Sequence, residues 1–270
     1  MAITVAQVNE LRQKTQAGMM DCKKALVESD GDMEKAVEWL RKKGIAKAEE
    51  KAGRAANQGI VAIKVQGNVA AMVELLCETD FVARNDLFKA YGAKLAEAAL
   101  GYDEDGDVSA KLISQFGEDL KEFIGIIKEN MKIRRAIRWT TTEGVFGSYI
   151  HTATPLAALV EMTGEVPAEL PNQVAMHITA FNPEYICPHC VPEARLAKEK
   201  EIALATAPQN KPANVIEGIV NGKINKWYSQ VCLIRQPWLM DDKTTLEKVA
   251  PKAKVVRFVR WLVGEELPQA

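Results

Sequence analysis

Gly59-Ile-Val-Ala-Ile-Lys-Val-Gln66 and Val69-Ala-Ala-Met-Val-Glu-Leu75 are the segments that decide the architecture of this chain. The first segment is apolar with strand-like alternation, and the second is an almost continuous apolar run. Gln66-Gly67-Asn68 separates them with the residue types that favour a tight turn. The pattern therefore predicts a β-hairpin that ends near Cys77.

A second copy of this pattern follows later in the chain. Gly144-Val-Phe-Gly-Ser-Tyr-Ile-His151 resembles the first segment, and Leu156-Ala-Ala-Leu-Val-Glu-Met162 resembles the second. A helical pattern follows each hairpin, over 81–100 and over 169–181. Such self-similarity predicts a duplicated α+β core, with an N-subdomain at 56–140 and a C-subdomain at 141–270.

The segment before the first hairpin is helical in pattern and ends in a charged linker, so that 1–55 is expected to form a separate domain. Thr4 and Gln7 match a capping box, and Asp32 can cap a later helix. The apolar spacing predicts a small three-helix bundle that ends at Gly44 and serves as a docking module. The residues 45–57 are rich in Lys, Glu and Ala, which predicts a solvated helical linker.

The second copy carries an insertion over 192–231. Two helical patterns there are joined by Ala207-Pro-Gln-Asn-Lys-Pro212, which predicts a projecting helical hairpin. Its apolar residues could pack within the pair or form a homodimer. The segments 231–240 and 254–263 are expected to be the closing strands of the second sheet.

The charge balance excludes some classes of function. The chain has 35 Lys and Arg residues against 36 Asp and Glu residues, and its net charge of −1 argues against a general nucleic-acid binder. No apolar run approaches the ~18 residues of a membrane span, so no membrane partner is expected. The N-terminal residues lack a basic segment followed by an apolar one, which predicts no secretory signal and a cytoplasmic protein.

Catalytic chemistry has little material in this sequence. There are three histidines in the chain, no phosphate-binding loop or nucleophile motif is present, and the carboxylates are scattered. We therefore predict no catalytic residue and no cofactor.

Cys187-Pro-His-Cys190 is the one local metal or redox signature. A closed zinc site needs two further ligands, and no second motif of this kind supplies them. We expect an inert loop and no metal, while a thiol or metal protein that uses Cys187 and Cys190 is kept as an alternative.

The segment from Cys77 to Asp86 connects the first hairpin to the next helix. Thr79 or Asp80 can cap that helix. Phe81 is then either a core aromatic that anchors the helix or an exposed tip that inserts into a partner, and composition does not decide between the two.

Three motifs closely resemble the translation elongation factor Ts family. They are Gln16-Ala-Gly-Met-Met-Asp-Cys-Lys-Lys-Ala-Leu26, Gly31-Asp-Met-Glu-Lys-Ala-Val-Glu-Trp-Leu-Arg41 and Cys77-Glu-Thr-Asp-Phe-Val-Ala-Arg-Asn85. Shorter matches extend the resemblance over nearly the whole chain: Lys132-Ile-Arg-Arg135, Gly147-Ser-Tyr-Ile-His151, Val174-Ala-Met-His177, Gln236-Pro-Trp-Leu-Met240 and Val263-Gly-Glu265.

The resemblance implies a non-enzymatic guanine-nucleotide exchange factor for elongation factor Tu. It implies that the N-terminal bundle is ubiquitin-associated-like and docks on the GTPase. It further implies that Asp80, Phe81, Val82 and Ala83 form a segment that disturbs the Mg²⁺ and phosphate site and so releases GDP. The other implied contact residues are Arg12, Met19, Met20, Lys23, Ile127, His151, Leu239 and Met240.

Some positions depart from the family pattern. Trp238 stands where Phe is usual, and Lys128 stands where Gly is frequent. Thr152 to Pro155 replaces a more usual Gly-Ala-Arg run, so the loop around His151 departs from the family pattern. A ubiquitin-associated-like adaptor without exchange activity is the remaining alternative, although such an adaptor has no need of the segment 79–85.

Overall fold

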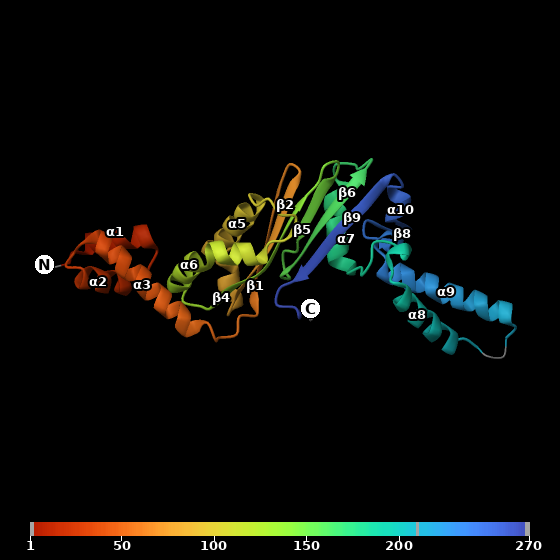
Figure 1. Ribbon diagram of the computed structural model, residues 1–270, viewed down its shortest axis with the longest axis horizontal. Coiled ribbons are helices and arrows are strands. Elements are labelled where there is room, and N and C mark those ends of the chain that lie inside the picture. Colours follow the sequence, from red (N-terminus) through yellow and green to blue (C-terminus); the bar gives the residue numbers. More distant parts are fainter. Residues whose placement is uncertain (1–2, 209–210, 268–270) are drawn as a thin grey trace. The chain divides into compact units, whose positions relative to one another are not determined.

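The computed structural model describes residues 3–208 and 211–267. The chain divides into two compact units (Figure 1). The first unit contains the residues up to Thr140 together with those from Leu262 onward, and the second unit runs from Thr141 to Trp261. The structure is of the α+β class.

The chain begins with the helices α1 (Val5–Thr15), α2 (Met19–Glu28) and α3 (Met33–Lys51). The predicted capping box is confirmed, because the Thr4 side chain accepts from the Gln7 backbone while the Gln7 side chain accepts from the Thr4 backbone. Asp32 caps α3 by accepting from the backbone N–H groups of Glu34 and Lys35. These helices bury a small core of their own: Val8, Leu11, Cys22, Ala25, Leu26 and Ala36.

The prediction that the third helix ends at Gly44 is wrong. Helix α3 continues through Gly44 to Lys51, and Gly44 faces Gly125 of α6 (Ser109–Ile127). A Cβ atom on Gly125 would lie 2.6 Å from the Gly44 Cα, so the two backbones approach as closely as glycine permits. Ala48 belongs to the core beneath the first sheet. This part of the expected linker is therefore packed against α6 and the core instead of being exposed to solvent.

The first sheet has the order β1-β2-β4-β3. Its strands are β1 (Gln58–Gln66), β2 (Val69–Cys77), β3 (Gly106–Asp107) and β4 (Met131–Thr140), and each adjacent pair is antiparallel. The predicted hairpin is confirmed, with Gln66 paired with Val69 at its turn. Helices α5 (Asp86–Leu100) and α6 pack on this sheet (Figure 1). The helix expected over 81–100 is broken at Asn85, which separates the short α4 (Asp80–Arg84) from α5.

The second unit contains the second hairpin. Strands β5 (Val145–Ile150) and β6 (Leu156–Gly164) are antiparallel, and β9 (Ala253–Leu262) completes a sheet of order β5-β6-β9. Helix α7 (Leu170–Phe181) packs directly on β5. A Cβ atom on Gly147 would lie 2.1 Å from the backbone of Pro171, so glycine is what allows this close approach.

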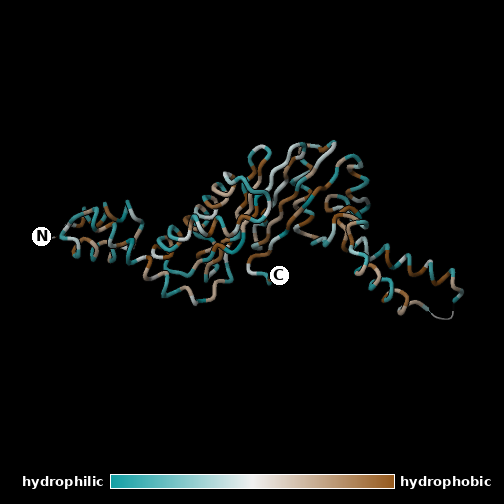
Figure 2. The backbone as a smooth tube through the Cα atoms, viewed as in Figure 1, coloured by the Kyte–Doolittle hydropathy of each residue, from teal (hydrophilic) through white to brown (hydrophobic). Residues whose placement is uncertain are grey.

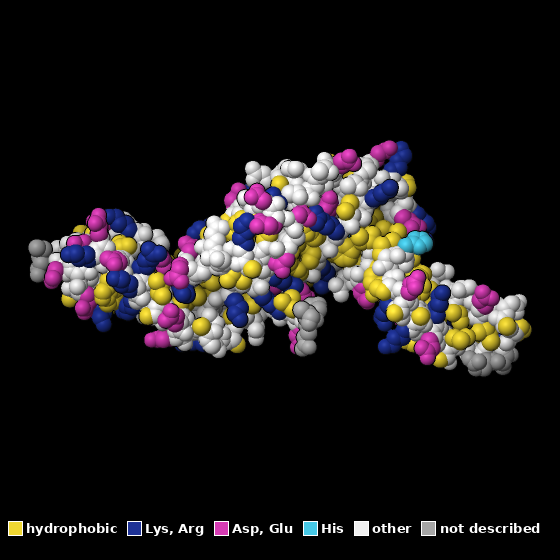
Figure 3. Space-filling model, viewed as in Figure 1, with side chains coloured by type: hydrophobic (Ala, Val, Ile, Leu, Met, Phe, Trp, Pro, Cys, Tyr) yellow, Lys and Arg dark blue, Asp and Glu magenta, His cyan; other side chains and the backbone are white. Residues whose placement is uncertain are grey.

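The insertion forms the helices α8 (Glu193–Ala205) and α9 (Ala213–Val231). Lys223 of α9 donates to the Thr206 carbonyl at 2.8 Å, and Trp227 and Val231 pack with Val191 at the base. Hydrophobic side chains remain on the surface of the hairpin (Figure 3). They include Ile202, Leu204 and Val215. The homodimer expected through these side chains stays a prediction.

The prediction of a closing strand over 231–240 is wrong. The residues after α9 form a 3-10 helix (Leu233–Arg235), the short β7 (Pro237–Trp238), β8 (Asp241–Thr245) and α10 (Leu246–Val249). The backbone N–H of Leu233 bonds to the Tyr185 carbonyl at 2.8 Å, and that of Ile234 bonds to the Ile186 carbonyl at 3.1 Å. These bonds to the loop after α7 take the place of a longer sheet ladder.

A buried carboxylate joins β2 to the residues after β9. The Glu74 side chain is fully buried and lies 3.0 Å from the guanidinium of Arg134 and 2.5 Å from that of Arg135. It also accepts from the Gly264 backbone N–H at 2.8 Å. Arg135 further contacts the carboxylate of Glu265 at 2.7 Å. This cluster attaches the C-terminal segment to the sheet of the first unit.

The equivalent position of the second hairpin carries the same chemistry. Glu161 of β6 is 6% exposed and lies 2.7 Å from the Arg257 guanidinium on β9. Apolar residues otherwise gather in the strands of both sheets (Figure 2). Within the described residues, no helix is both long enough and apolar enough to span a membrane.

Replacing Glu74 tests how strongly this cluster stabilises the first unit. Glu74→Ala removes the carboxylate that both guanidiniums contact, and it should lower the free energy of unfolding by about 3–5 kcal/mol in urea titrations. Glu97→Ala is the control, because its pair with Lys64 is exposed and should contribute less than about 1 kcal/mol. Equal losses in the two variants would contradict this prediction.

Candidate partner-binding site

The predicted tip is the short helix α4, which is closed at both ends. The Thr79 hydroxyl accepts from the Val82 backbone N–H at 3.3 Å. At the other end, the Asn85 backbone N–H bonds to the Val82 carbonyl at 2.9 Å, and the Asn85 side chain accepts from Leu87 N–H to begin α5. Thr79 is therefore the cap, and the suggestion that Asp80 could be the cap is wrong. Asp80 lies in the first helical turn and pairs with Arg84 at 3.1 Å.

The side chains of α4 point in two directions. Val82 and Ala83 are partly buried against the core of the first unit. Phe81 is 81% exposed, the largest exposed fraction of any large hydrophobic residue that the structure describes. The first of the two alternatives, a core aromatic, is therefore wrong for Phe81. An apolar ring on a helix that is anchored by its other side chains is available to contact a partner.

Ile127 is a further predicted contact residue of the first unit. It is the last residue of α6 and packs, partly buried, against the same core as Val82 and Ala83. The fold thereby brings the end of α6 and the tip to one core, although 43 or more residues of sequence separate them (127 − 84 = 43). The next residue, Lys128, has a left-handed backbone with φ of 71°, which explains why glycine suits this position.

The four predicted docking residues of the N-terminal helices are all exposed. Arg12 lies on α1, and Met19, Met20 and Lys23 lie on α2. Met20 is 74% exposed and Met19 is 49% exposed. Met20 and Lys23 are three residues apart on the helix and share a face. The helix thus presents an apolar and a basic side chain together.

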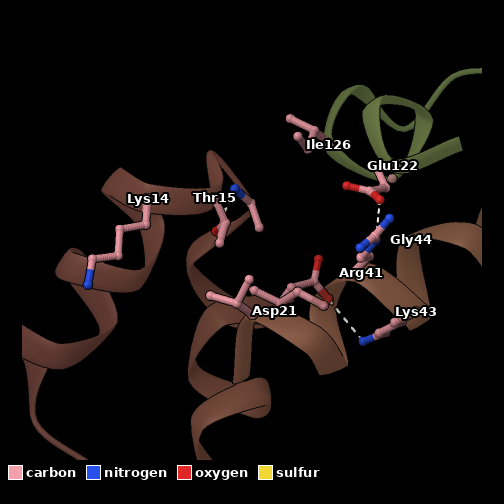
Figure 4. A pocket seen from close by; sticks show the side chains of 12 residues that line it. Lys14, Thr15, Asp21, Arg41, Lys43, Gly44, Glu122 and Ile126 are labelled. Carbon is pink, nitrogen blue, oxygen red and sulfur yellow. Dashed lines mark hydrogen bonds and ion pairs between the residues drawn. The ribbon is translucent and has the colours of Figure 1, made fainter. Parts of the chain in front are cut away.

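A hollow of about 260 Å³ lies where these helices meet α6. Figure 4 shows two ion pairs among its charged side chains, Arg41 with Glu122 and Lys43 with Asp21. Lys14, which also lines the hollow, pairs outside it with Glu10. Asp21 also lies 3.5 Å from Lys128. Because these side chains already have partners, the hollow presents no unpaired charge among them. The Arg41–Glu122 pair joins α3 to α6, and the Asp21–Lys128 pair joins α2 to the residue that follows α6.

In the second unit, His151 follows β5. Its Nδ1 accepts from the backbone N–H groups of Ala153 at 3.2 Å and of Thr154 at 3.0 Å. The imidazole therefore organises the turn between β5 and β6. A contact role for His151 stays a prediction.

Leu239 and Met240 lie on the turn between β7 and β8, with Met240 48% exposed. The buried His177 supports this turn, because its Nδ1 accepts from the Leu239 backbone N–H at 3.3 Å. Its Nε2 lies 3.0 Å from Gln236 Oε1, to which it donates in the neutral tautomer. The imidazole stacks against Phe181 and Trp238. Burial lowers the pKa of His177 below its usual 6.5.

The supporting role of His177 and Gln236 was not apparent from the sequence. Both residues lie within motifs that resemble the family, but a lone His on a helix carries no local signal for the turn it supports. Its partners are 59 and 62 residues away. Trp238, which departs from the family pattern, supplies one of the two stacking rings.

The cysteine motif was expected to be an inert loop. The structure instead pairs Cys187 with Cys190 in a disulfide, with a Cα–Cα distance of 5.2 Å. The other cysteines, Cys22, Cys77 and Cys232, are buried and unpaired with one another. Among residues 3–208 and 211–267, no cluster of three or more His, Cys, Asp or Glu side chains could hold a metal ion.

Comparison with known proteins gives a consistent result. The family model "Elongation factor TS" matches residues 78–265. The elongation factor Ts of Trichlorobacter lovleyi is 42% identical over 99% of this chain and 94% of its own length. Those of Paramagnetospirillum magneticum and Levilactobacillus brevis are each 43% identical over 97% of this chain and 92% of their own lengths.

The lowered pKa of His177 predicts a pH dependence of stability. Below pH 6.5 the unfolded chain binds a proton at this residue that the folded chain resists, so the free energy of unfolding should fall as the pH drops from 7.5 through 6.5 to 5.5. Urea titrations at these pH values measure the slope. His177→Gln should reduce the slope, whereas His189→Gln, at an exposed position, should leave it unchanged. An undiminished slope in His177→Gln would contradict the assignment.

Proposed function

The chain belongs to the elongation factor Ts family, and on that premise we propose that it is a guanine-nucleotide exchange factor for elongation factor Tu. The observation that carries the proposal is the exposure of Phe81 on a helix capped by Thr79 and Asn85. Val82 and Ala83 anchor that helix on the core. A held aromatic side chain can enter a partner without first losing much conformational freedom.

The proposed mechanism is displacement rather than chemistry. Phe81 inserts beside the nucleotide site of the GTPase and moves side chains that support Mg²⁺ and the phosphates. Asp80 brings a negative charge to the same place, where it disfavours bound phosphate. GDP then dissociates faster although the chain itself has no contact with the guanine. No catalytic residue or cofactor is needed on this chain.

Thermodynamic linkage defines what such a factor must do. The chain binds the nucleotide-free GTPase more tightly than the GDP-bound form. GDP must then weaken the binding of this chain by the same factor by which the chain weakens the binding of GDP. The complex should therefore form without nucleotide and dissociate when GDP is added in excess.

The remaining surfaces have docking roles in this proposal. The N-terminal helices, as a ubiquitin-associated-like domain within 1–55, place Arg12, Met19, Met20 and Lys23 against the GTPase. Ile127 in the N-subdomain, and His151, Leu239 and Met240 in the C-subdomain, provide further contacts. This assignment is supported by the exposure of the α2 residues and of Met240. We further infer that the two hairpins are copies of one duplicated unit, since each buries a Glu at the same position of its second strand.

An adaptor without exchange activity is the competing function. It would need the docking helices alone and would give Phe81 no task. The exposed tip favours the exchange factor over the adaptor. A GDP-release assay on purified elongation factor Tu separates the two, because an adaptor would bind the GTPase without accelerating release.

Truncation of Phe81 tests the proposed tip. Phe81→Ala should slow stimulated GDP release by about 30-fold to 1000-fold, as for an aromatic hot spot worth about 2–4 kcal/mol. Its free energy of unfolding should change by less than about 0.5 kcal/mol because the ring is exposed. Leu87→Ala, which alters an exposed apolar residue on the neighbouring α5, is the matched control and should keep full activity. Unchanged release by Phe81→Ala would refute the role of the tip.

A substitution on α2 should affect docking, and not the maximal rate of GDP release that Phe81→Ala lowers. Met20→Ser should raise the concentration of this chain that gives half-maximal GDP release by about tenfold, because it removes an exposed apolar contact, and the maximal rate should stay near that of the unaltered chain. Val27→Ser is the control, since Val27 lies on the same helix at 54% exposure but is not among the expected contacts. A lower maximal rate with unchanged half-saturation would assign α2 to release rather than to docking.

A further inference from the structure

The backbone just before the tip is held by a carboxylate from a distant part of the sequence. Glu129 lies between α6 and β4, and its Oε2 accepts from the backbone N–H groups of Glu78 at 3.1 Å and of Thr79 at 3.0 Å. Its Oε1 accepts from the Thr79 hydroxyl at 2.6 Å. Hydrogen bonds to an ionised carboxylate are stronger than those between neutral groups.

The neighbouring residues return the interaction. Glu78 Oε1 accepts from the Asn130 backbone N–H at 2.6 Å, so that the two segments exchange carboxylate–backbone bonds. Asn130 is buried, and its side-chain amide donates to the Arg54 carbonyl at 2.7 Å. The residues that follow α6 are thereby bonded both to Arg54, which precedes β1, and to Glu78, which follows β2.

Thr79 transmits this restraint to the tip. Its hydroxyl donates to Glu129 while accepting from the Val82 backbone N–H of α4. The buried Cys77 thiol donates to the Thr79 carbonyl at 3.2 Å. Burial, reinforced by the Glu129 charge, raises the pKa of Cys77 to about 12, so this thiol stays protonated and remains a donor.

We propose that Glu129 is a positioning residue for nucleotide exchange, which holds Thr79 and thereby sets the place and rigidity of α4 and Phe81. The proposal rests on the exchange function proposed above and adds to it a residue outside the tip. Glu129 acts through Phe81 and needs no contact of its own with the GTPase.

The order of the tip in the free chain should affect the maximal rate of GDP release. If the tip is loose in the free chain, then its ordering opposes insertion and slows release once the complex has formed. Docking through the N-terminal helices does not depend on this order. Loss of Glu129 should therefore lower the maximal rate of GDP release and change the half-saturating concentration little.

The experiment compares three substitutions of Glu129 in the full chain, with GDP release from purified elongation factor Tu as the readout. Glu129→Ala removes all the hydrogen bonds of the carboxylate, and the maximal rate should fall by about tenfold or more. Glu129→Gln retains the length and one acceptor oxygen for the two backbone N–H groups, while its amide can donate to the Thr79 hydroxyl. It should stay within about threefold of the unaltered chain.

Glu129→Asp separates reach from charge. It keeps the negative charge but is one methylene shorter, so it should lose activity as Glu129→Ala does. A direct effect of the charge on Mg²⁺ or phosphate would give the opposite order, with Asp active and Gln inactive, and would overturn the proposal. Glu118→Ala is the matched control, because Glu118 is an exposed carboxylate on α6 that forms an ion pair with Lys121, and it should have full activity.

A double-mutant cycle with Phe81→Ala distinguishes positioning from general destabilisation. If Glu129 acts through Phe81, then Glu129→Ala should reduce release by less than about twofold when Phe81 is already Ala. Rates are normalised to the folded fraction from the urea titration. An unreduced loss in the Phe81→Ala background would overturn the proposal.

Amide hydrogen exchange of the free chain supplies a readout that needs no GTPase. The N–H groups of Glu78, Thr79 and Val82 should exchange at least about tenfold faster in Glu129→Ala than in Glu129→Gln, with the amides of β2 unchanged. Equal protection in the two variants would overturn the proposal. If the unaltered chain failed to accelerate GDP release, the proposed function would be wrong. An active unaltered chain with a fully active Glu129→Ala would refute the role of Glu129 alone.

Discussion

A carboxylate inside a sheet has to be compensated, and in this protein that requirement joins distant parts of the chain. Glu74 is placed in the middle of the first hairpin by its position in an apolar strand, where water does not reach it. It is stabilised by Arg134 and Arg135 from β4 and by the Gly264 backbone from beyond β9. The pairing of β2 with β4 and the return of the C-terminal segment to the first unit both bring hydrogen-bond donors to this one carboxylate.

The exposed helix α4 of the first unit follows the same strand. Strand β2 ends at Cys77, and within a few residues the chain turns into α4. Because the contacts of Glu74 with Arg134 and Arg135 hold the middle of β2, the residues from which that turn starts are held in place. The bonds from Glu129 to Glu78 and Thr79 then determine how the turn is made. The exposed ring of Phe81 is thus carried by a series of restraints that begins in the buried sheet.

The second unit also pairs a buried carboxylate and supports an exposed turn, but it uses other residues for both. Glu161 is paired with Arg257 between β6 and β9. Its exposed turn with Leu239 and Met240 is supported by the neutral imidazole of His177 rather than by a carboxylate. In both units, a side chain from elsewhere in the sequence accepts backbone hydrogen bonds at a short exposed segment or just before it. Replacing the support can therefore alter the exposed segment without altering the residues that the segment itself contains.

Sequence patterns were sufficient where the controlling interactions are local. Both hairpins, the Thr4–Gln7 capping box, the Asp32 cap and the helices of the insertion depend on residues a few positions apart, and all are present. The family resemblance, which rests on contiguous motifs, was confirmed in the same way. Local patterns could not decide whether Phe81 is buried, because exposure depends on what packs around α4. They placed the end of the third helix at Gly44, because the contact of Gly44 with Gly125 joins residues 81 positions apart (125 − 44 = 81). They likewise gave no sign of the supporting roles of Glu129 and His177, whose hydrogen-bond partners lie 50 to 62 residues away. Side chains so far apart in the sequence meet only when the tertiary structure brings them together.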